Sequence, residues 1–353
     1  MSDLIQKLEQ SIENLENKAA KIYFFVQDTK GNARASVRYI YEMAMTLKKL
    51  GYNPHILHEK SDYFGVQDWL GNEYMELPHI TVEGQNLQIA PEDTIIVPEL
   101  FGYVMSQVAN LPCAKIALCQ SYDYIFETLQ PGQTWPQFGF NKCITTSESM
   151  KDYISKTMRG CSIDVLEPTL FESFQKSKFP AKPIVAIHTR EQRDSINFIK
   201  SFYAKFPQYR WISFRDMRAL SQKEFAEVLK DCMVSVWVDD ISSFGTYPLE
   251  SMACGVPVIG KAPSLVPNWI SENNGIWIQE KTRLQDILAD YVQNWLEDNV
   301  SLNLYEGGIN TAEKYKNQEK FESTLSTLFE GYTSVRLTTF NDELNKQQEE
   351  QKV

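Results

Sequence analysis

The sequence predicts an α/β protein of two doubly wound, parallel-sheet domains that face each other across a cleft. Short continuous apolar segments alternate with amphipathic segments, as in parallel sheets that helices cover on both faces. This alternation occurs in two series, separated by a polar segment at 171–182 that contains Pro180 and is followed by Pro183. The length of 353 residues is sufficient for two domains.

The N-terminal domain is expected over residues 1–170. Residues 3–19 form a polar helical pattern with one apolar stripe, so this helix either packs on the domain or joins two copies of the chain as a homodimer. An amphipathic helix is expected at 35–50. The expected strands are the apolar segments at 21–27, 54–58, 94–99, 115–120, 142–147 and 162–168.

The C-terminal domain is expected over residues 183–330, after the linker at 171–182 and before a polar tail at 331–353. Its strands are predicted at 183–188, 209–214, 234–239, 257–260 and 275–278. Its helices are predicted at 194–206, 222–231 and near 246–254, with further helices in the last 70 or so residues.

Composition excludes several classes of protein. With 35 Lys and Arg against 46 Asp and Glu, the net charge is −11, which argues against nucleic-acid binding. No apolar run approaches the ~18–20 residues of a membrane span, and residues 1–20 lack the apolar core of a signal peptide, so we expect a cytoplasmic protein. Peripheral association with the inner membrane face stays open. The six cysteines form no C-x-x-C pair and no zinc-like cluster with histidine, so neither a metal nor a cofactor is expected.

The most informative segment is 234–270, in which a strand ends at Asp239 and a helix begins near Thr246. Ligands of doubly wound folds bind outside the carboxyl ends of the strands. The start of the helix offers backbone N–H groups and a positive dipole end, which together favour a diphosphate. Glu250, one turn inside the helix, can accept hydrogen bonds from hydroxyls such as those of a ribose.

The residues FGTYPLESMACGVPVIG resemble the donor-binding signature of the retaining group 1 (family 4) glycosyltransferases, which have the GT-B fold of two Rossmann-like domains. The matching positions are Phe244, Gly245, Leu249, Glu250, Met252, Ala253, Gly255, Pro257, Val258 and Ile259. The resemblance implies that the C-terminal domain holds a nucleotide-sugar. Phe244, Gly245 and Thr246 would then present amides to the donor, and Glu250 would bind the ribose.

One position departs from that signature. The family has two glutamates separated by seven residues, and Ser242 occupies the place of the first, which approaches the transferred sugar. A serine supplies no carboxylate, so Asp239 or Asp240 would have to substitute. A second interpretation is that the chain is a non-catalytic GT-B subunit that binds a partner enzyme or a glycan.

The family also places an Arg and a Lys, both in contact with the donor phosphates, after the first strand of the C-terminal domain. Arg190 and Arg193 stand at comparable positions, and a guanidinium suits phosphate oxygens. A solvated loop is the alternative, because Glu191 and Asp194 could pair with either arginine.

In the N-terminal domain, the resemblance implies roles for two loops. Gly31 lies where the family has a glycine-rich loop that approaches phosphate and acceptor, although a simple strand–helix turn explains it nearly as well. Gln120 replaces a common histidine near the acceptor, and Tyr122 would contact a sugar ring. Asp123 would assist the acceptor hydroxyl or merely cap a helix.

The resemblance therefore implies a metal-independent hexosyltransferase. It would transfer a sugar from a UDP-, GDP- or dTDP-linked donor to a glycan or lipid-linked acceptor, with retention, in bacterial surface polysaccharide biosynthesis.

Overall fold

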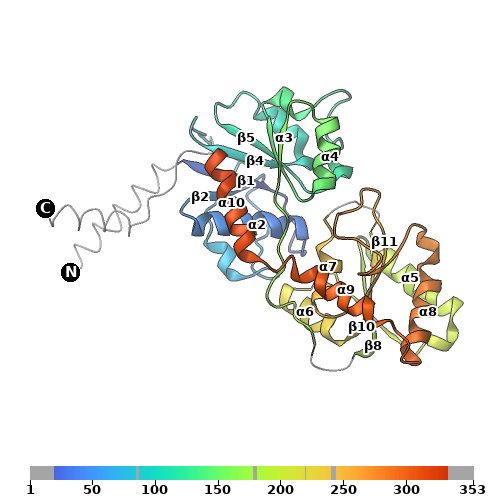
Figure 1. Ribbon diagram of the computed structural model, residues 1–353. Coiled ribbons are helices and arrows are strands. Elements are labelled where there is room, and N and C mark those ends of the chain that lie inside the picture. The colour runs from blue at the N-terminus through green and yellow to red at the C-terminus, as the bar shows by residue number, and fades with distance from the viewer. Residues whose placement is uncertain (1–19, 85–86, 178–180, 219, 240–243, 333–353) are drawn as a thin grey trace, which may run out of the picture.

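The computed structural model describes residues 20–84, 87–177, 181–218, 220–239 and 244–332. These residues form two α/β domains, each built on a parallel sheet, as Figure 1 shows. The predicted fold class is confirmed. The helix expected at 3–19, Ser242 and nearly all of the polar tail lie outside the described residues.

Within the described ranges, the N-terminal sheet has seven strands in the order β3-β2-β1-β4-β5-β6-β7. All of its neighbouring strands are parallel. The strands are β1 (Lys21–Val26), β2 (Asn53–His58), β3 (His79–Thr81), β4 (Thr94–Pro98), β5 (Ala114–Cys119), β6 (Lys142–Thr145) and β7 (Ser162–Val165). The chain reverses its direction of travel across the sheet between β1 and β4, where a doubly wound fold opens its ligand crevice.

The helices of this domain are α2 (Ala35–Lys49), α3 (Gly102–Gln107) and α4 (Glu148–Thr157). Short 3₁₀ segments are η1 (Asn72–Glu76), η2 (Glu99–Phe101), η3 (Tyr122–Tyr124) and η4 (Trp135–Phe138). Helix α2 ends with Lys48 and Lys49, which complement its dipole, and Gly51 follows with a φ of 82°. One face of the sheet packs on α2, and the other packs on α3, α4 and η4.

The C-terminal sheet contains five described strands in the order β12-β11-β10-β8-β9, again all parallel. They are β8 (Lys182–Thr189), β9 (Ser213–Asp216), β10 (Cys232–Val238), β11 (Val258–Lys261) and β12 (Ile276–Ile278). The helical elements are α5 (Gln192–Lys205), η5 (Pro207–Tyr209), α6 (Gln222–Asp231), α7 (Thr246–Ala253), η6 (Lys281–Arg283), α8 (Leu284–Leu296) and α9 (Leu302–Glu313). The reversal lies between β8 and β10, so the loops after these strands open onto the crevice of this domain.

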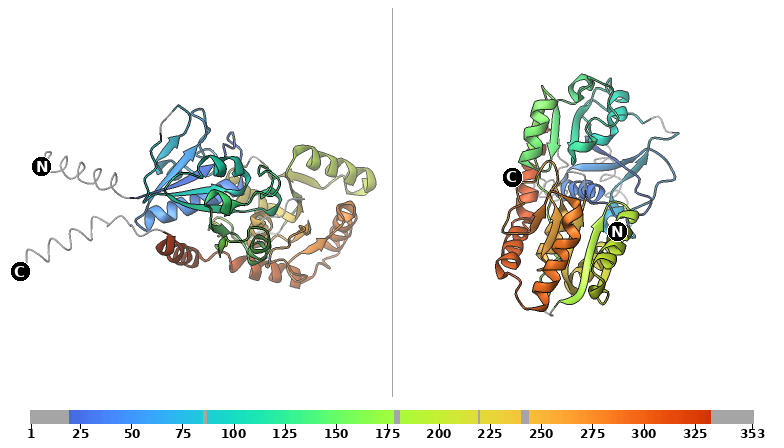
Figure 2. Two further views of the ribbon diagram at one scale, coloured as in Figure 1. Left: turned by 90° about the horizontal axis from the view of Figure 1, so that it is seen from above. Right: turned by 90° about the vertical axis from the view of Figure 1, so that its right-hand side faces the viewer.

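The last described helix, α10 (Gln318–Tyr332), returns to the N-terminal domain. Phe321, Leu325 and Phe329 are buried in the same core as α2, and Figures 1 and 2 show the helix beside that domain. The predicted C-terminal domain at 183–330 therefore includes most of α10, although this helix packs in the core of the N-terminal domain. The boundary at 170 and the linker at 171–182 also differ from expectation, because Leu170 and Phe174 already pack in the C-terminal core.

Two strands differ from the sequence-based prediction. The strand expected at 209–214 overlaps β9 only at its end, because Tyr209 closes a 3₁₀ segment and buries its ring in the core while Trp211 stays largely exposed. Strand β3 was not predicted, because its three residues are too few to show an alternating pattern. It is stabilised by parallel pairing with β2.

Candidate active site in the interdomain cleft

A cleft of about 520 Å³ lies between the two domains. The N-terminal domain lines it with the start of α2 and with residues that follow β1, β4 and β5. The C-terminal domain contributes residues that follow β8 and β10 and the start of α7. The carboxyl ends of both sheets thus face one space, which is where doubly wound folds bind ligands.

The start of α7 is shaped by Gly245, which has a φ of 77° and a ψ of 58°. A Cβ atom at this position would lie 3.0 Å from the ring of Trp269. Trp269 also donates a hydrogen bond of 2.7 Å from Nε1 to the carbonyl of Phe244, whose own ring is buried against Tyr315. These contacts fix the turn before α7 and leave the backbone of Thr246 lining the cleft.

The carboxylate of Glu250 is paired with Arg38, which comes from α2 of the opposite domain. Nη1 of Arg38 donates to Oε1 of Glu250, and both residues are buried, with 2% and 4% of their surfaces exposed. The two residues lie 212 positions apart in the sequence. Glu250 lines the cleft, and one of its oxygens already accepts a hydrogen bond from the N-terminal domain.

Arg38 has further partners. Its Nη1 donates to Oε1 of Gln222 at 3.2 Å, and its guanidinium lies 5.1 Å from the ring centre of Phe171. Its Nε lies 3.5 Å from Oε1 of Glu42, one turn along α2. Burial raises the pKa of Glu42 to about 7, although the charge of Arg38 opposes this shift. One guanidinium thus lies between two buried carboxyl groups.

Arg190 follows β8 and also connects the domains. Its Nε and Nη2 lie 3.4 and 3.3 Å from the two oxygens of Asp239, at the end of β10. Its Nη1 donates to the hydroxyl of Tyr124 in the N-terminal domain at 2.6 Å. A guanidinium held by a bidentate carboxylate and a phenol is positioned firmly, and it lines the cleft.

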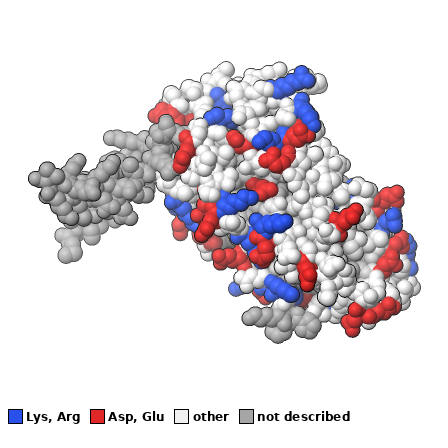
Figure 3. Space-filling model, in the orientation of Figure 1, with Lys and Arg blue, Asp and Glu red and all other residues white. Residues whose placement is uncertain are grey.

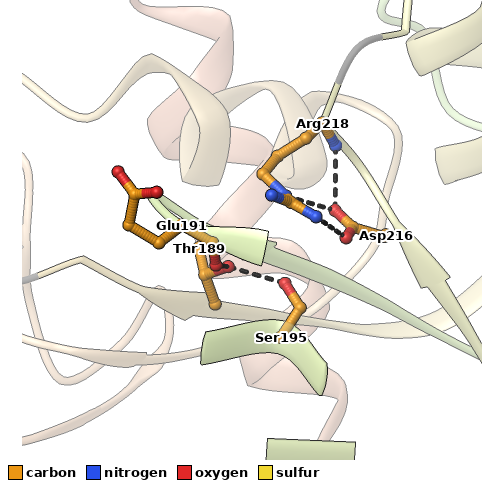
Figure 4. A network of polar contacts seen from close by, with 5 residues as sticks. All are labelled: Thr189, Glu191, Ser195, Asp216 and Arg218. Carbon is orange, nitrogen blue, oxygen red and sulfur yellow. Dashed lines mark hydrogen bonds and ion pairs between the residues drawn. The ribbon is translucent and has the colours of Figure 1, made fainter. Parts of the chain in front are cut away.

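The loop that carries Arg190 is held by a small network (Figure 4). The hydroxyl of Thr189 donates to the carbonyl of Glu191 at 2.8 Å and lies 2.6 Å from the hydroxyl of Ser195 in α5. Beside it, Arg218 donates from Nε to Asp216 at 2.9 Å. Although partial burial raises it, the hydrogen bonds from Arg218 hold the pKa of Asp216 below its usual value.

His188 lines the cleft at the end of β8, with its ring stacked 4.6 Å from that of Tyr247. Burial lowers its pKa to about 4, although Asp239 and Asp216 favour the charged form. The imidazole is therefore neutral at pH 7, and it forms part of the wall of the cleft.

Glu99 lies at the end of β4, beside the reversal in the N-terminal sheet. Its Oε1 accepts a hydrogen bond of 2.8 Å from the amide of Ser121, while its buried Oε2 has no hydrogen-bond partner in the described part of the chain. Burial raises its pKa to about 7, and nearby backbone amides partly oppose the shift. Glu42 and Glu99 are thus two buried carboxyl groups that titrate near neutrality, and of these two Glu99 lines the cleft.

The structure brings together many of the residues expected to form the site. Those that line the cleft are Arg190, Gln120, Phe244, Gly245, Thr246 and Glu250. Among them, Gln120 donates from its side chain to the carbonyl of Ser36 at 3.1 Å, and only the backbone of Phe244 is available, since its ring is buried.

Four expected residues do not line the cleft. Arg193 is exposed on the first turn of α5, and Gly31 is exposed in the turn before α2. The ring of Tyr122 packs 5.2 Å from that of Tyr153, and Asp123 is an exposed residue of η3. The position of Ser242 is outside the described residues.

Sequence reasoning missed Arg38, Glu42 and Glu99. Arg38 and Glu42 belong to the amphipathic helix expected at 35–50, and charged residues of such a helix ordinarily face solvent. Their i, i+4 spacing is an ordinary surface pattern, so only the contact with the other domain distinguishes them. Glu99 follows an apolar strand directly, and that position at a carboxyl end was a usable signal.

The surface and the remaining side chains add few specific features. On the face shown in Figure 3, Lys and Arg side chains lie among Asp and Glu side chains. In the part of the chain that is described, no three His, Cys, Asp or Glu residues are grouped to hold a metal ion. Nor does that part contain a helix long and apolar enough to cross a membrane.

The comparisons with known proteins agree with this geometry. Solved structures match over nearly the whole chain. Sucrose-phosphate synthase from Thermosynechococcus elongatus matches with a TM-score of 0.63 and 14% identity, over 88% of this chain and 98% of that one. The pneumococcal O-GlcNAc transferase GtfA, solved with UDP and GlcNAc, matches with a TM-score of 0.65 and 9% identity, over 89% and 99%. The chain has the GT-B fold.

Another GT-B structure, Anabaena HepE in complex with UDP-glucose, matches with a TM-score of 0.62 and 12% identity over 88% of this chain and 99% of that one. Residues 217–318 match the family model described as "Glycosyl transferases group 1". That segment contains α7 and Glu250. No curated protein matches the chain by sequence. The family match and the GT-B neighbours together support a glycosyltransferase.

Proposed function

We propose that this protein transfers a sugar from a nucleotide-sugar to an acceptor bound in the same cleft. The observation that carries the proposal is the position of the family match in the structure. The segment that matches the group 1 glycosyltransferases supplies the start of α7 and Glu250, and these line the cleft between the domains. GtfA and HepE were solved with UDP or UDP-glucose, which favours the same class of donor here.

In this proposal the C-terminal domain binds the donor. The amides at the start of α7 face the diphosphate, and the carboxylate of Glu250 accepts hydrogen bonds from the ribose. Arg190 neutralises the diphosphate as it leaves, and its fixed geometry means that little reorganisation is needed during the reaction. Its charge lets the reaction proceed without a metal ion.

The acceptor then lies against the N-terminal domain, near Gln120 and Tyr124, which line the opposite wall. A glycan or a lipid-linked sugar suits an open cleft between two domains. Retention of configuration and a role in bacterial surface polysaccharide synthesis are proposed from the resemblance noted above. A cytoplasmic location is proposed from the composition, and peripheral association with the inner membrane face stays open.

A second candidate is favoured by two contacts. Glu250 is paired with Arg38, and Arg190 is paired with Asp239, so both groups assigned to the donor already have protein partners. A GT-B subunit that has lost transfer would keep such pairs permanently and use its surface to bind a partner enzyme or a glycan.

Ligand-observed NMR with UDP-, GDP- and dTDP-glucose separates the two. Binding of one donor supports the enzyme, and binding of none refutes it. The Glu250→Gln variant should weaken binding by about 10–100-fold, because a charge-assisted hydrogen bond contributes about 1.5–3 kcal/mol. Glu272→Gln, an exposed carboxylate of the same domain, is the control. Arg190→Met provides a second variant if Glu250→Gln unfolds.

The missing glutamate at Ser242 is tested by turnover. If Asp239 supplies the carboxylate, Asp239→Asn should slow transfer by roughly 10–100-fold with little effect on donor affinity. Asp240→Asn makes the parallel test for its neighbour. Transfer that occurs only in Ser242→Glu would identify the natural chain as a disabled transferase.

A further inference from the structure

We propose that Glu42 is a positioning residue that acts on the cleft through Arg38. When the hydroxyls of a nucleotide ribose bind the carboxylate of Glu250, the guanidinium of Arg38 pairs with Glu42, and Glu42 releases a proton. The inference rests on the proposed donor role of Glu250. It adds a residue that touches no substrate and acts through Arg38.

The geometry places both carboxyl groups within reach of one guanidinium. Nη1 of Arg38 donates to Glu250, and Nε of the same group lies 3.5 Å from Oε1 of Glu42. Neither oxygen of Glu42 has a hydrogen-bond partner among the described residues, and neither does the Nε of Arg38. The two groups therefore form an ion pair without a hydrogen bond, and Arg38 has a second carboxyl group beside the one to which it donates.

The balance of charge explains why Arg38 donates to Glu250 and not to Glu42 in this structure. Arg38, Glu42 and Glu250 are 2%, 8% and 4% exposed, so each charge among them is costly unless it is paired. One guanidinium compensates one carboxylate, and it lies on Glu250. Burial and the charge of Glu250 raise the pKa of Glu42 to about 7, so near neutral pH this carboxyl is substantially protonated.

A bound ribose changes this balance. Its hydroxyls donate to Glu250, so Arg38 loses part of its compensation and moves to Glu42. The carboxyl of Glu42 then loses its proton to solvent and becomes the anion that compensates Arg38. The O–H bond of Glu42 breaks, an ion pair forms, and the buried cluster keeps one guanidinium with one carboxylate, while the second carboxylate is solvated by the ribose.

Other groups around Glu42 do not offer an alternative charge. The titratable groups that face it are Arg38 and Tyr39 from α2, Tyr74 from η1 and Glu250 from α7. Burial raises the pKa of both tyrosines, so they stay neutral at pH 7. Arg38 is thus the cation available to Glu42 within the described cluster.

Calorimetry of donor binding in buffers of different ionisation enthalpy tests the proposal. The probe is whichever of UDP-, GDP- or dTDP-glucose binds, because their diphosphates carry no proton between pH 6 and 8. Wild type should release about three quarters of a proton at pH 6.5 and bind about tenfold more tightly at pH 8 than at pH 6. Glu42→Gln should bind without this release and without the tenfold change. Glu73→Gln, an exposed carboxylate of η1, should behave like wild type.

The outcomes separate the two ideas. Donor binding without proton release in wild type, or equal release in Glu42→Gln, overturns the role of Glu42 and leaves the proposed function standing. Binding of no donor overturns the proposed function and this role with it.

A second measurement needs no ligand and remains usable if Glu42→Gln binds poorly. Glu250→Gln removes the charge that now holds Arg38, as a ribose would. Glu42 should then be ionised. In a chain that keeps Glu250, Glu42→Gln should change the pH dependence of stability, because it removes a carboxyl group with a raised pKa. In a chain that carries Glu250→Gln, the same substitution should change the pH dependence of stability less. An equal change in both chains overturns the exchange of partners.

Discussion

Replacement of Arg38 by methionine tests how much the interdomain ion pair contributes to stability. The change keeps an unbranched side chain and removes its charge and its hydrogen-bond donors. Glu250 is then left buried without its cation, and loss of one partner from a buried pair costs about 3–5 kcal/mol. Gln222 also loses a hydrogen bond worth about 1 kcal/mol, which favours the upper end of that range.

The measurement is urea unfolding at pH 7 of wild type, Arg38→Met, Glu250→Gln and the double variant. Because both single changes break one contact, the double variant should be less destabilised than their sum, by about 2 kcal/mol or more. Lys205→Met breaks an exposed pair with Asp286 and should cost at most about 1 kcal/mol. A loss below about 1 kcal/mol in Arg38→Met, or strict additivity, would refute the reasoning.

Four further predictions concern other parts of the molecule. Gly245→Ala should destabilise by about 1–3 kcal/mol, more than Gly132→Ala, because both have positive φ but only Gly245 would place a Cβ 3.0 Å from Trp269; urea unfolding compares them. Glu99 has a pKa of about 7 when folded, above its ordinary 4.5, so its contribution to stability is full below pH 4.5 and falls by about 3 kcal/mol as the pH rises through 7. Glu99→Gln should flatten that part of the stability–pH curve, and an identical curve would contradict the assignment. Phe329→Ala, in the core that α10 shares with α2, should cost about 3–5 kcal/mol in thermal or urea unfolding, whereas a loss below 1 kcal/mol would contradict that packing. Transfer activity should survive EDTA, and turnover that Mg²⁺ restores after chelation would contradict neutralisation by arginine.

Much of the fold could be predicted from the sequence because the determining signals are local. Apolar runs such as 21–27 and 234–239 are long enough to mark buried parallel strands, and α6 begins at a capping box of Ser221 and Glu224. The signature around Glu250 is likewise contiguous. These features need only neighbouring residues, so they can be identified without knowing how the chain folds back on itself.

Tertiary structure alone decided which side chains meet. Nothing in the sequence near Arg38 distinguishes it from the solvent-facing arginine of an ordinary amphipathic helix, and its partner Glu250 lies 212 residues away. The packing of Phe329 beside α2 was equally hidden, because an apolar helix face does not indicate which of two cores will bury it. Ion pairing and core burial depend on distance in space, and two domains that close over a cleft create those short distances only after both have folded.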